Sequence, residues 1–168
     1  MRKFTTRDLT MAALIAATYA ALTLALPAYG TIQFRISEAL TVLPFLFAPA
    51  TPGIIIGCLV ANLLSPYGIV DIVCGTAATA IAAVWTSKLK NKWLAPLPPV
   101  LCNFDIIGGM IAWYEVGFTS AFPAFFALNA FSVGLSELLA CYGLGLVLLL
   151  ALPKIPYLRG RMVPERLS

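Results

Sequence analysis

Long apolar segments constrain what this chain can fold into more than any other feature. A membrane-spanning helix takes about 20 predominantly apolar residues, and four segments suit that length, at about 9–27, 68–87, 98–115 and 123–152. The first exceeds the 7–15 residue apolar core of a signal peptide, so we expect a retained helix. Only 11% of the 168 residues are charged, against about a quarter in soluble domains. The sequence therefore predicts an all-α integral membrane protein.

Two shorter apolar runs lie between the first and second long segments, at about 38–50 and 53–65. Each has about 13 residues, which gives about 20 Å of helix, and a proline-rich turn at 48–53 separates them. They form either two short or tilted spans or a re-entrant pair. Counted as spans, they complete a six-transmembrane-helix bundle in which helices 2 and 3 are short. The whole chain, 1–168, is then one membrane domain with a basic tail at 154–168.

The basic residues set the expected orientation. With six spans, ten of the eleven Lys and Arg residues fall on one side of the membrane, and only Arg35 falls on the other. Basic loops are enriched on the cytoplasmic side, so we expect both termini and the loop at 88–92 in the cytoplasm and segment 29–33 outside. The ten residues are Arg2, Lys3, Arg7, Lys88, Lys90, Lys92, Lys154, Arg159, Arg161 and Arg166.

Polar residues inside the apolar segments predict a binding site. An ionisable group at the centre of a membrane helix costs roughly 2.5–3.5 kcal/mol and usually faces a cavity or a partner. The expected topology gathers these residues in the outward half of the bundle, where a site would be open to the outside. The candidate substrate-binding residues are Arg35, Glu38, Asn62, Tyr67, Asp71, Asn129 and Glu137.

Some polar residues have simpler explanations. Arg35 and Glu38 are three residues apart and could form a local ion pair at a helix mouth. Ser132 and Ser136 are small polar residues of the kind that hydrogen-bond between membrane helices. For these positions a structural role therefore stands beside the functional one.

Asn103 and Asp105 are harder to place. They lie two residues apart, about 200° around a helix, so they cannot both face one cavity unless the helix is irregular. The expected topology puts them in the inner half of the bundle. There they would hold helices together or meet a partner protein.

Small residues recur every four positions in the first helix. Such spacing lets another helix approach closely. Because alanine is common in membrane helices, the spacing alone is weak evidence for such a contact. The two rows are Ala12, Ala16 and Ala20, and Ala13, Ala17 and Ala21, with Gly53 and Gly57 as a further pair of this kind.

The chain lacks the residues that metal and nucleotide chemistry need. It has no histidine, the commonest metal ligand and the usual general base near pH 7. Its four cysteines lie in apolar runs without a CxxC pair, which favours packing over a metal or redox role. It also has no GxxxxGK[ST] phosphate loop. We expect no metal or cofactor, and any uphill transport must draw its energy from elsewhere.

Three stretches carry a family resemblance: QFRISEALTVLPF, GCLVANLLSPYGIVDIVCGT and LNAFSVGLSELLACYGLGL. With them, the chain resembles the QueT family of queuosine-precursor transporters, which are substrate-binding (S) components of energy-coupling factor (ECF) transporters. The resemblance spans nearly the whole chain. It implies a six-helix fold in the bacterial plasma membrane with both termini in the cytoplasm.

The resemblance also implies partners and a cargo. The partners would be a transmembrane coupling subunit and two cytosolic ATPases, with no nucleic acid. An AxxxA pattern contacts the coupling subunit in related S components, and Ala12/Ala16 and Ala13/Ala17 both match it. The cargo would be a 7-deazaguanine such as preQ0, preQ1 or queuine.

The candidate residues suit such a base. A carboxylate can accept a bidentate, charge-assisted pair from the N–H edge of a guanine-type ring. Glu38, Asp71 and Glu137 are the three candidates, and an aminomethyl group on the ligand would give a second carboxylate a cation. Tyr67 or Phe34 could stack on the ring.

Three other functions stay open from the sequence. The chain could be an S component for another vitamin-like solute, because any planar, donor-rich ligand suits this polar set. It could be a small integral-membrane enzyme that uses paired carboxylates for acid–base work. It could also be an accessory protein that packs against other helices and binds no ligand.

Overall fold

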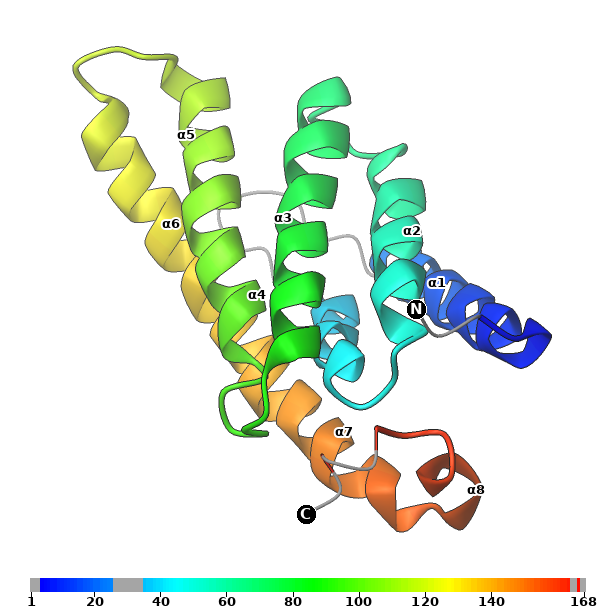
Figure 1. Cartoon of the computed structure of the whole chain (residues 1–168). Coiled ribbons are helices and arrows are strands. Elements are labelled where there is room, and N and C mark those ends of the chain that lie inside the picture. Colours follow the sequence, from blue (N-terminus) through cyan, green and yellow to red (C-terminus); the bar gives the residue numbers. More distant parts are fainter. Residues whose placement is uncertain (1–3, 26–34, 164–165, 167–168) are drawn as a thin grey trace.

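The computed structural model describes residues 4–25, 35–163 and 166, and these residues form a helical bundle (Figure 1). Four of the described elements, η1 to η4, are 3₁₀ or π-helical, and the other eight are α-helices. The fourth irregular element, η4, is a single 3₁₀ turn. The elements are α1 (Thr6–Ala25), η1 (Ile36–Phe45), α2 (Ala50–Asn62), α3 (Ile69–Lys88), α4 (Leu97–Cys102), η2 (Asn103–Ile107), α5 (Gly108–Val116), α6 (Phe122–Leu138), η3 (Leu139–Gly145), α7 (Leu146–Ala151), η4 (Leu152–Lys154) and α8 (Pro156–Arg159).

Long apolar helices dominate the described part of the chain. Three of them are long and apolar enough to cross a membrane: α1, α3 and the continuous helix from Phe122 to Lys154. The elements α4, η2 and α5 also follow one another without a break. The prediction of a helical membrane protein is confirmed, whereas the number of six spans stays a prediction.

The second expected helix differs in type and length. The apolar run at 38–50 predicts one short helix, but the structure has a 3₁₀ helix, η1, that ends at Phe45. Pro44 lies inside it and has no N–H to donate, which favours an end to regular helix nearby. A ten-residue 3₁₀ helix is unusually long and often marks strain or a hinge.

The proline-rich segment at 48–53 is not a simple turn. Helix α2 already begins at Ala50 and includes Pro52 in its first turn. The first N–H groups of a helix have no partner inside the helix, so proline is tolerated there. This corrects the expected start of the third helix from residue 53 to residue 50.

Helices α1 and α2 form a close seam. A Cβ atom added to Gly53 would lie 2.7 Å from the carbonyl oxygen of Ala12, and one added to Gly57 would lie 2.7 Å from that of Ala16. Only glycine allows the two backbones to approach this far. In Figure 1, α3 follows on the other side of α2, between α2 and α5.

The C-terminal tail folds back onto η1. The Val163 N–H donates to the Leu46 carbonyl at 2.9 Å, and Met162 is buried in the core. The Arg166 guanidinium donates to the carbonyls of Phe45 and Ser87. The tail therefore joins the end of η1 to the end of α3.

Candidate functional site

A small, partly open cavity lies where η1, α2, α3, η2 and α6 meet. Its volume is about 20 Å³, which is room for about one water molecule. The polar side chains at its surface come from helices far apart in the sequence. The lining residues are Arg35, Glu38, Cys58, Gly75, Thr79, Asn103, Ile107, Val133 and Glu137.

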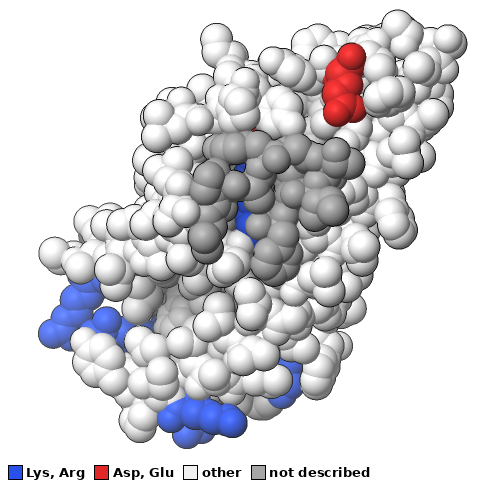
Figure 2. Space-filling view, turned by 180° about the vertical axis from the view of Figure 1, so that it is seen from behind, with Lys and Arg blue, Asp and Glu red and all other residues white. Residues whose placement is uncertain are grey.

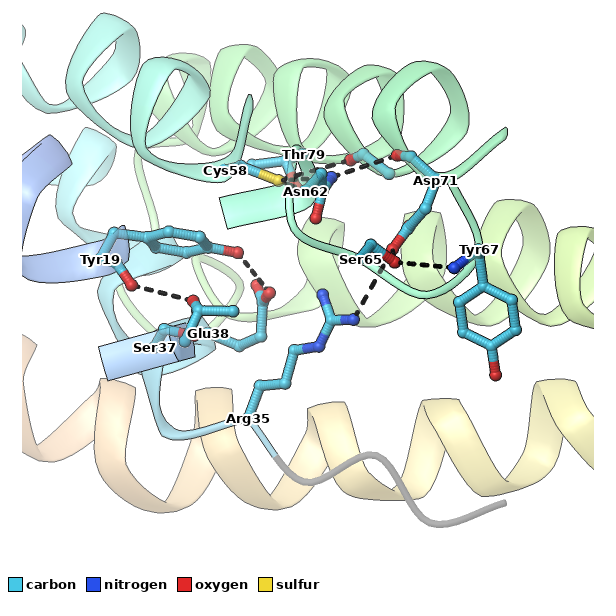
Figure 3. Close-up of polar contacts among 12 residues, drawn as sticks. Tyr19, Arg35, Ser37, Glu38, Cys58, Asn62, Ser65, Tyr67, Asp71 and Thr79 are labelled. Atoms are coloured by element: carbon cyan, nitrogen blue, oxygen red, sulfur yellow. Dashed lines mark hydrogen bonds and ion pairs between the residues drawn. The ribbon is translucent and has the colours of Figure 1, made fainter. Parts of the chain in front are cut away.

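Glu38 is held by a tyrosine from the first helix. The Tyr19 hydroxyl donates to Glu38 Oε1 at 2.5 Å, and Tyr19 itself is fully buried. The other carboxyl oxygen, Glu38 Oε2, is buried and has no hydrogen-bond partner among the described residues. Figure 3 shows the phenol ring pointing from α1 toward this carboxyl group. A buried carboxyl oxygen of this kind is suited to a donor on a ligand.

Glu137 has a partner that sequence spacing alone does not assign. The Asn103 side-chain amide donates to Glu137 Oε1 at 2.7 Å, and both residues are buried. Asn103 opens the π-helical element η2, while Asp105 is exposed. Although the helix is irregular at this point, the two side chains still do not share one cavity, as their spacing predicts. Asn103 belongs to the candidate site, and Asp105 does not.

Arg35 lies between the cavity and Asp71. Its guanidinium is 4.0 Å from Asp71 Oδ2, and the Ser65 hydroxyl donates to the same oxygen at 2.5 Å. The Asn62 amide donates to the Asp71 backbone carbonyl at 3.1 Å. Figure 3 shows these groups on one side of Arg35 and Glu38 on the other. Asp71 therefore pairs with Arg35, and Asn62 in turn bonds to Asp71. Neither Asp71 nor Asn62 lines the cavity.

Two predicted site residues lie apart from the cavity. Tyr67 packs edge-on against Tyr114, with ring centroids 5.2 Å apart. The Asn129 amide donates to Glu115 Oε2 at 2.8 Å, which ties α6 to α5. The structure brings neither residue to the cavity lining. Phe34, the other expected stacking residue, lies outside the described residues.

Sequence reasoning missed several polar contacts. The contact of Tyr19 with Glu38 was not expected, because Tyr19 lies in an alanine-rich apolar helix. Its hydroxyl group, the polar atom between two rows of alanines, is the signal that could have pointed to it. The Thr23 hydroxyl donates to Ser37 at 2.7 Å and joins α1 to η1. The Cys141 sulfur lies 3.4 Å from the backbone carbonyl of Glu38 and 3.8 Å from Glu137 Oε1. These contacts join residues up to 103 positions apart, which local patterns cannot reveal.

The charges near the cavity are unequal. Among the described residues that line it or pair with its lining, the cation is Arg35, and the carboxyl groups are those of Glu38, Asp71 and Glu137. Uncompensated carboxylates are costly away from water. The arrangement therefore suits a ligand that brings N–H donors or a positive charge.

The two alanine rows of α1 have different surroundings. Ala12 is buried and Ala16 half-buried against α2, where Gly53 and Gly57 approach them. Ala13 and Ala17 are exposed. The first row is thus used within the chain, and the second is open on the surface of the described structure.

Comparisons with known proteins point to one family. The model of the QueT transporter family matches residues 9–154. The chain is 36% identical over 85 residues to the "Queuosine precursor transporter QueT" of Lactococcus lactis subsp. cremoris (strain MG1363). That match covers 48% of this chain and 50% of the relative, so it spans about half the length of each. No solved structure gives a significant match.

Proposed function

This chain belongs to the QueT transporter family, and from that premise we propose that it is the substrate-binding subunit of an ECF-type importer. In this role it binds a queuosine precursor, a 7-deazaguanine, from outside the cell. Partner subunits then drive its delivery inward. Membership of a transporter family implies that the chain is not an enzyme.

The observation that carries this proposal is the pair of buried carboxyl groups at the cavity. Glu38 and Glu137 each accept one hydrogen bond from a side chain across a helix interface, from Tyr19 and from Asn103. A guanine-type edge presents adjacent N–H donors, which a carboxylate accepts as a charge-assisted pair. We assign the edge of the base to Glu137, which lies deeper along α6 than Asn129.

The carboxyl group of Glu38 would favour a precursor that carries a positive charge. With Arg35 close to Asp71, Glu38 is the group best placed to meet an aminomethyl cation on the ligand. A cationic precursor should then bind more tightly than a neutral one of the same ring. The cationic and the neutral compound are both queuosine precursors, so this preference concerns which precursor binds more tightly and not the class of substrate.

Binding requires the cavity to widen. Ligand sites commonly occupy about 300–1,000 Å³, far more than the 20 Å³ between these side chains. The 3₁₀ helix η1 carries Glu38 and begins directly after Arg35. We expect η1 to shift when the base enters, because its hydrogen bonds are poorer than those of an α-helix.

The exposed alanine row supports a separate docking face. We assign Ala13 and Ala17 to the contact with a transmembrane coupling subunit, which would in turn bind two cytosolic ATPases. Ala12 and Ala16 match the same pattern but pack on α2. The chain has no phosphate loop of its own, which is consistent with energy supplied in trans.

The charge distribution supports the proposed orientation. In Figure 2 most of the Lys and Arg side chains lie toward the lower end of the molecule, and the prominent acidic side chain lies at the upper end. We place the lower end in the cytoplasm, and we expect both termini on the same side of the membrane. An impermeant maleimide should label a cysteine at Ser120 in intact cells and leave one at Asn91 unlabelled. The reverse pattern contradicts this orientation.

Calorimetry on purified variants tests substrate recognition. Glu137→Gln keeps the size of the side chain but replaces an anionic acceptor by an amide, so affinity for a 7-deazaguanine should fall by about 1.5–3 kcal/mol, ten- to over a hundredfold. Asp105→Asn is the matched control, because Asp105 is exposed, and it should leave affinity unchanged. Unchanged affinity in both Glu137→Gln and Glu38→Gln rules out carboxylate recognition of the base.

A ligand panel tests the class of substrate. Thermal shifts are measured for the wild-type protein with 7-deazaguanines, queuine and several vitamins. A true ligand at 100 times its dissociation constant adds about 2.7 kcal/mol of stability. A shift with a vitamin and none with any 7-deazaguanine would assign the chain to another solute.

A further inference from the structure

A second cleft lies at the basic end of the molecule, away from the candidate substrate site. Its volume is about 510 Å³, within the range of small-molecule sites. It is bounded by the first turns of α1 and by the segment around α8. Arg7 and Arg161 line it, and the described lining residues include no carboxylate.

Arg7 is an exposed residue in the first turn of α1, next to the residues that cap this helix. The Thr5 N–H donates to Asp8 Oδ2 at 3.0 Å, and the Asp8 N–H donates to Thr5 Oγ1 at 3.3 Å. This reciprocal pair is a capping box, which defines where a helix begins. Arg7 therefore lies in the first turn of a 20-residue helix, where the helix dipole adds positive potential.

Arg161 is held at the opposite wall of the cleft. Its Nη2 donates to the Tyr157 hydroxyl at 2.7 Å, and its guanidinium carbon lies 4.5 Å from the centre of the same ring. A guanidinium has five N–H donors, so this bond leaves others for an anion. The two arginines therefore place positive charge on both walls of the cleft.

The wall between the arginines is apolar. Met11, Leu14 and Leu158 line the same cleft, and Leu14 is 67% exposed. Leu14 lies seven residues after Arg7, about 10 Å further along the axis of α1. The cleft thus has positive charge near the start of α1 and apolar side chains further along the same helix.

We propose that this cleft binds an anionic phospholipid. The phosphate bonds to Arg7 and Arg161, because guanidinium groups pair with phosphate oxygens in a bidentate manner. An acyl chain follows Met11 and Leu14 along the apolar face of α1. Basic pockets beside membrane helices bind lipid headgroups in this way. A soluble phosphate has the anion but lacks the acyl chain, so it cannot use the apolar wall.

Native mass spectrometry of the full-length protein tests the site, with phosphatidylglycerol and phosphatidylcholine as probes. The wild type should retain phosphatidylglycerol in preference to phosphatidylcholine. The variant Arg7→Gln with Arg161→Gln should bind phosphatidylglycerol about 25-fold more weakly, from about fivefold for each arginine. Lys90→Gln with Lys92→Gln removes two positive charges outside the cleft and should bind it as the wild type does.

Three results would overturn the proposal. The first is equal retention of phosphatidylglycerol by the arginine variant and the wild type. The second is an equal loss in the lysine variant, which would mean that net charge alone attracts the lipid. The third is displacement by inorganic phosphate at the concentration at which the lipid binds. If the arginine variant keeps its lipid but loses co-purifying transporter subunits, the cleft is a protein-docking surface instead.

Discussion

The seam between α1 and α2 and the polar cavity beside it are built in opposite ways. At the seam, glycines let two backbones touch, and a Cβ at Gly57 would lie 2.7 Å from a carbonyl oxygen. At the cavity, long polar side chains from distant helices meet around a space of about 20 Å³. The close backbone contact at the seam leaves no space for a larger side chain, whereas the hydrogen-bonded side chains at the cavity can separate and bond to a ligand instead. The first region should govern stability and the second affinity.

The two regions are joined through one residue. A Cβ at Gly57 would also lie 3.0 Å from the Cβ of Tyr19, and the Tyr19 hydroxyl bonds to Glu38. The seam therefore sets the position from which Tyr19 reaches the cavity. Substitutions can separate the two roles.

The largest effect is expected at the seam. Gly57→Leu places a bulky side chain against backbone atoms, which cannot yield as a flexible side chain does, so the loss should exceed the roughly 1–3 kcal/mol typical of overpacking. The monodisperse fraction in detergent should collapse. Gly143→Leu is the matched control, since a Cβ there meets nothing within 4 Å. Equal yields of the two variants would contradict a tight seam.

A smaller loss is expected at the π-helical turn. Asn103→Leu removes the donor to the buried Glu137 carboxyl group. The loss of a hydrogen bond to a charged group should lower the free energy of unfolding by about 1.5–3 kcal/mol. The variant should also bind a 7-deazaguanine more weakly in calorimetry. Asp105→Leu, two residues on and exposed, should change stability little. If the two variants behave alike, the Asn103–Glu137 bond has no energetic role.

Tyr19→Phe should act mainly on the ligand. It keeps the ring that packs at the seam and removes only the hydroxyl that holds Glu38. We expect a stability loss of about 1 kcal/mol, together with a weaker preference for aminomethyl-bearing over neutral precursors. Competition between such a pair of ligands measures the preference. An unchanged ratio would separate Glu38 from cation recognition.

The smallest effect on the isolated protein is expected on the open face of α1. Ala17→Trp should leave folding and ligand binding intact, because Ala17 is exposed, yet abolish uptake and co-purification of a coupling subunit. Ala16→Trp should instead damage the fold, since Ala16 packs against Gly57. Normal uptake by Ala17→Trp would exclude that row as the docking face.

The class of fold and the family were accessible from the sequence, because apolar length and long ordered motifs are local properties. The polar residues Glu38 and Glu137 stand out for the same reason, and the structure brings both to one cavity. That Asn103 and not Asp105 lies at the cavity depends on its contact with Glu137 on another helix, which local spacing does not encode. Tyr67 and Asn129 find partners on α5 instead, and only the packing of helices reveals that.

The return of the tail to η1 has a consequence for how the protein is made. Arg166 meets Phe45 across 121 residues, and Cys141 meets Glu38 across 103. Contacts of such long sequence separation form late, because a large loop must close first. During synthesis η1 therefore enters the membrane before two of the residues that it contacts, Cys141 and Arg166, have been made. A ribosome-bound chain stopped before residue 139 should leave Glu38 open to solvent reagents, and its protection should appear only when the final helix has been inserted.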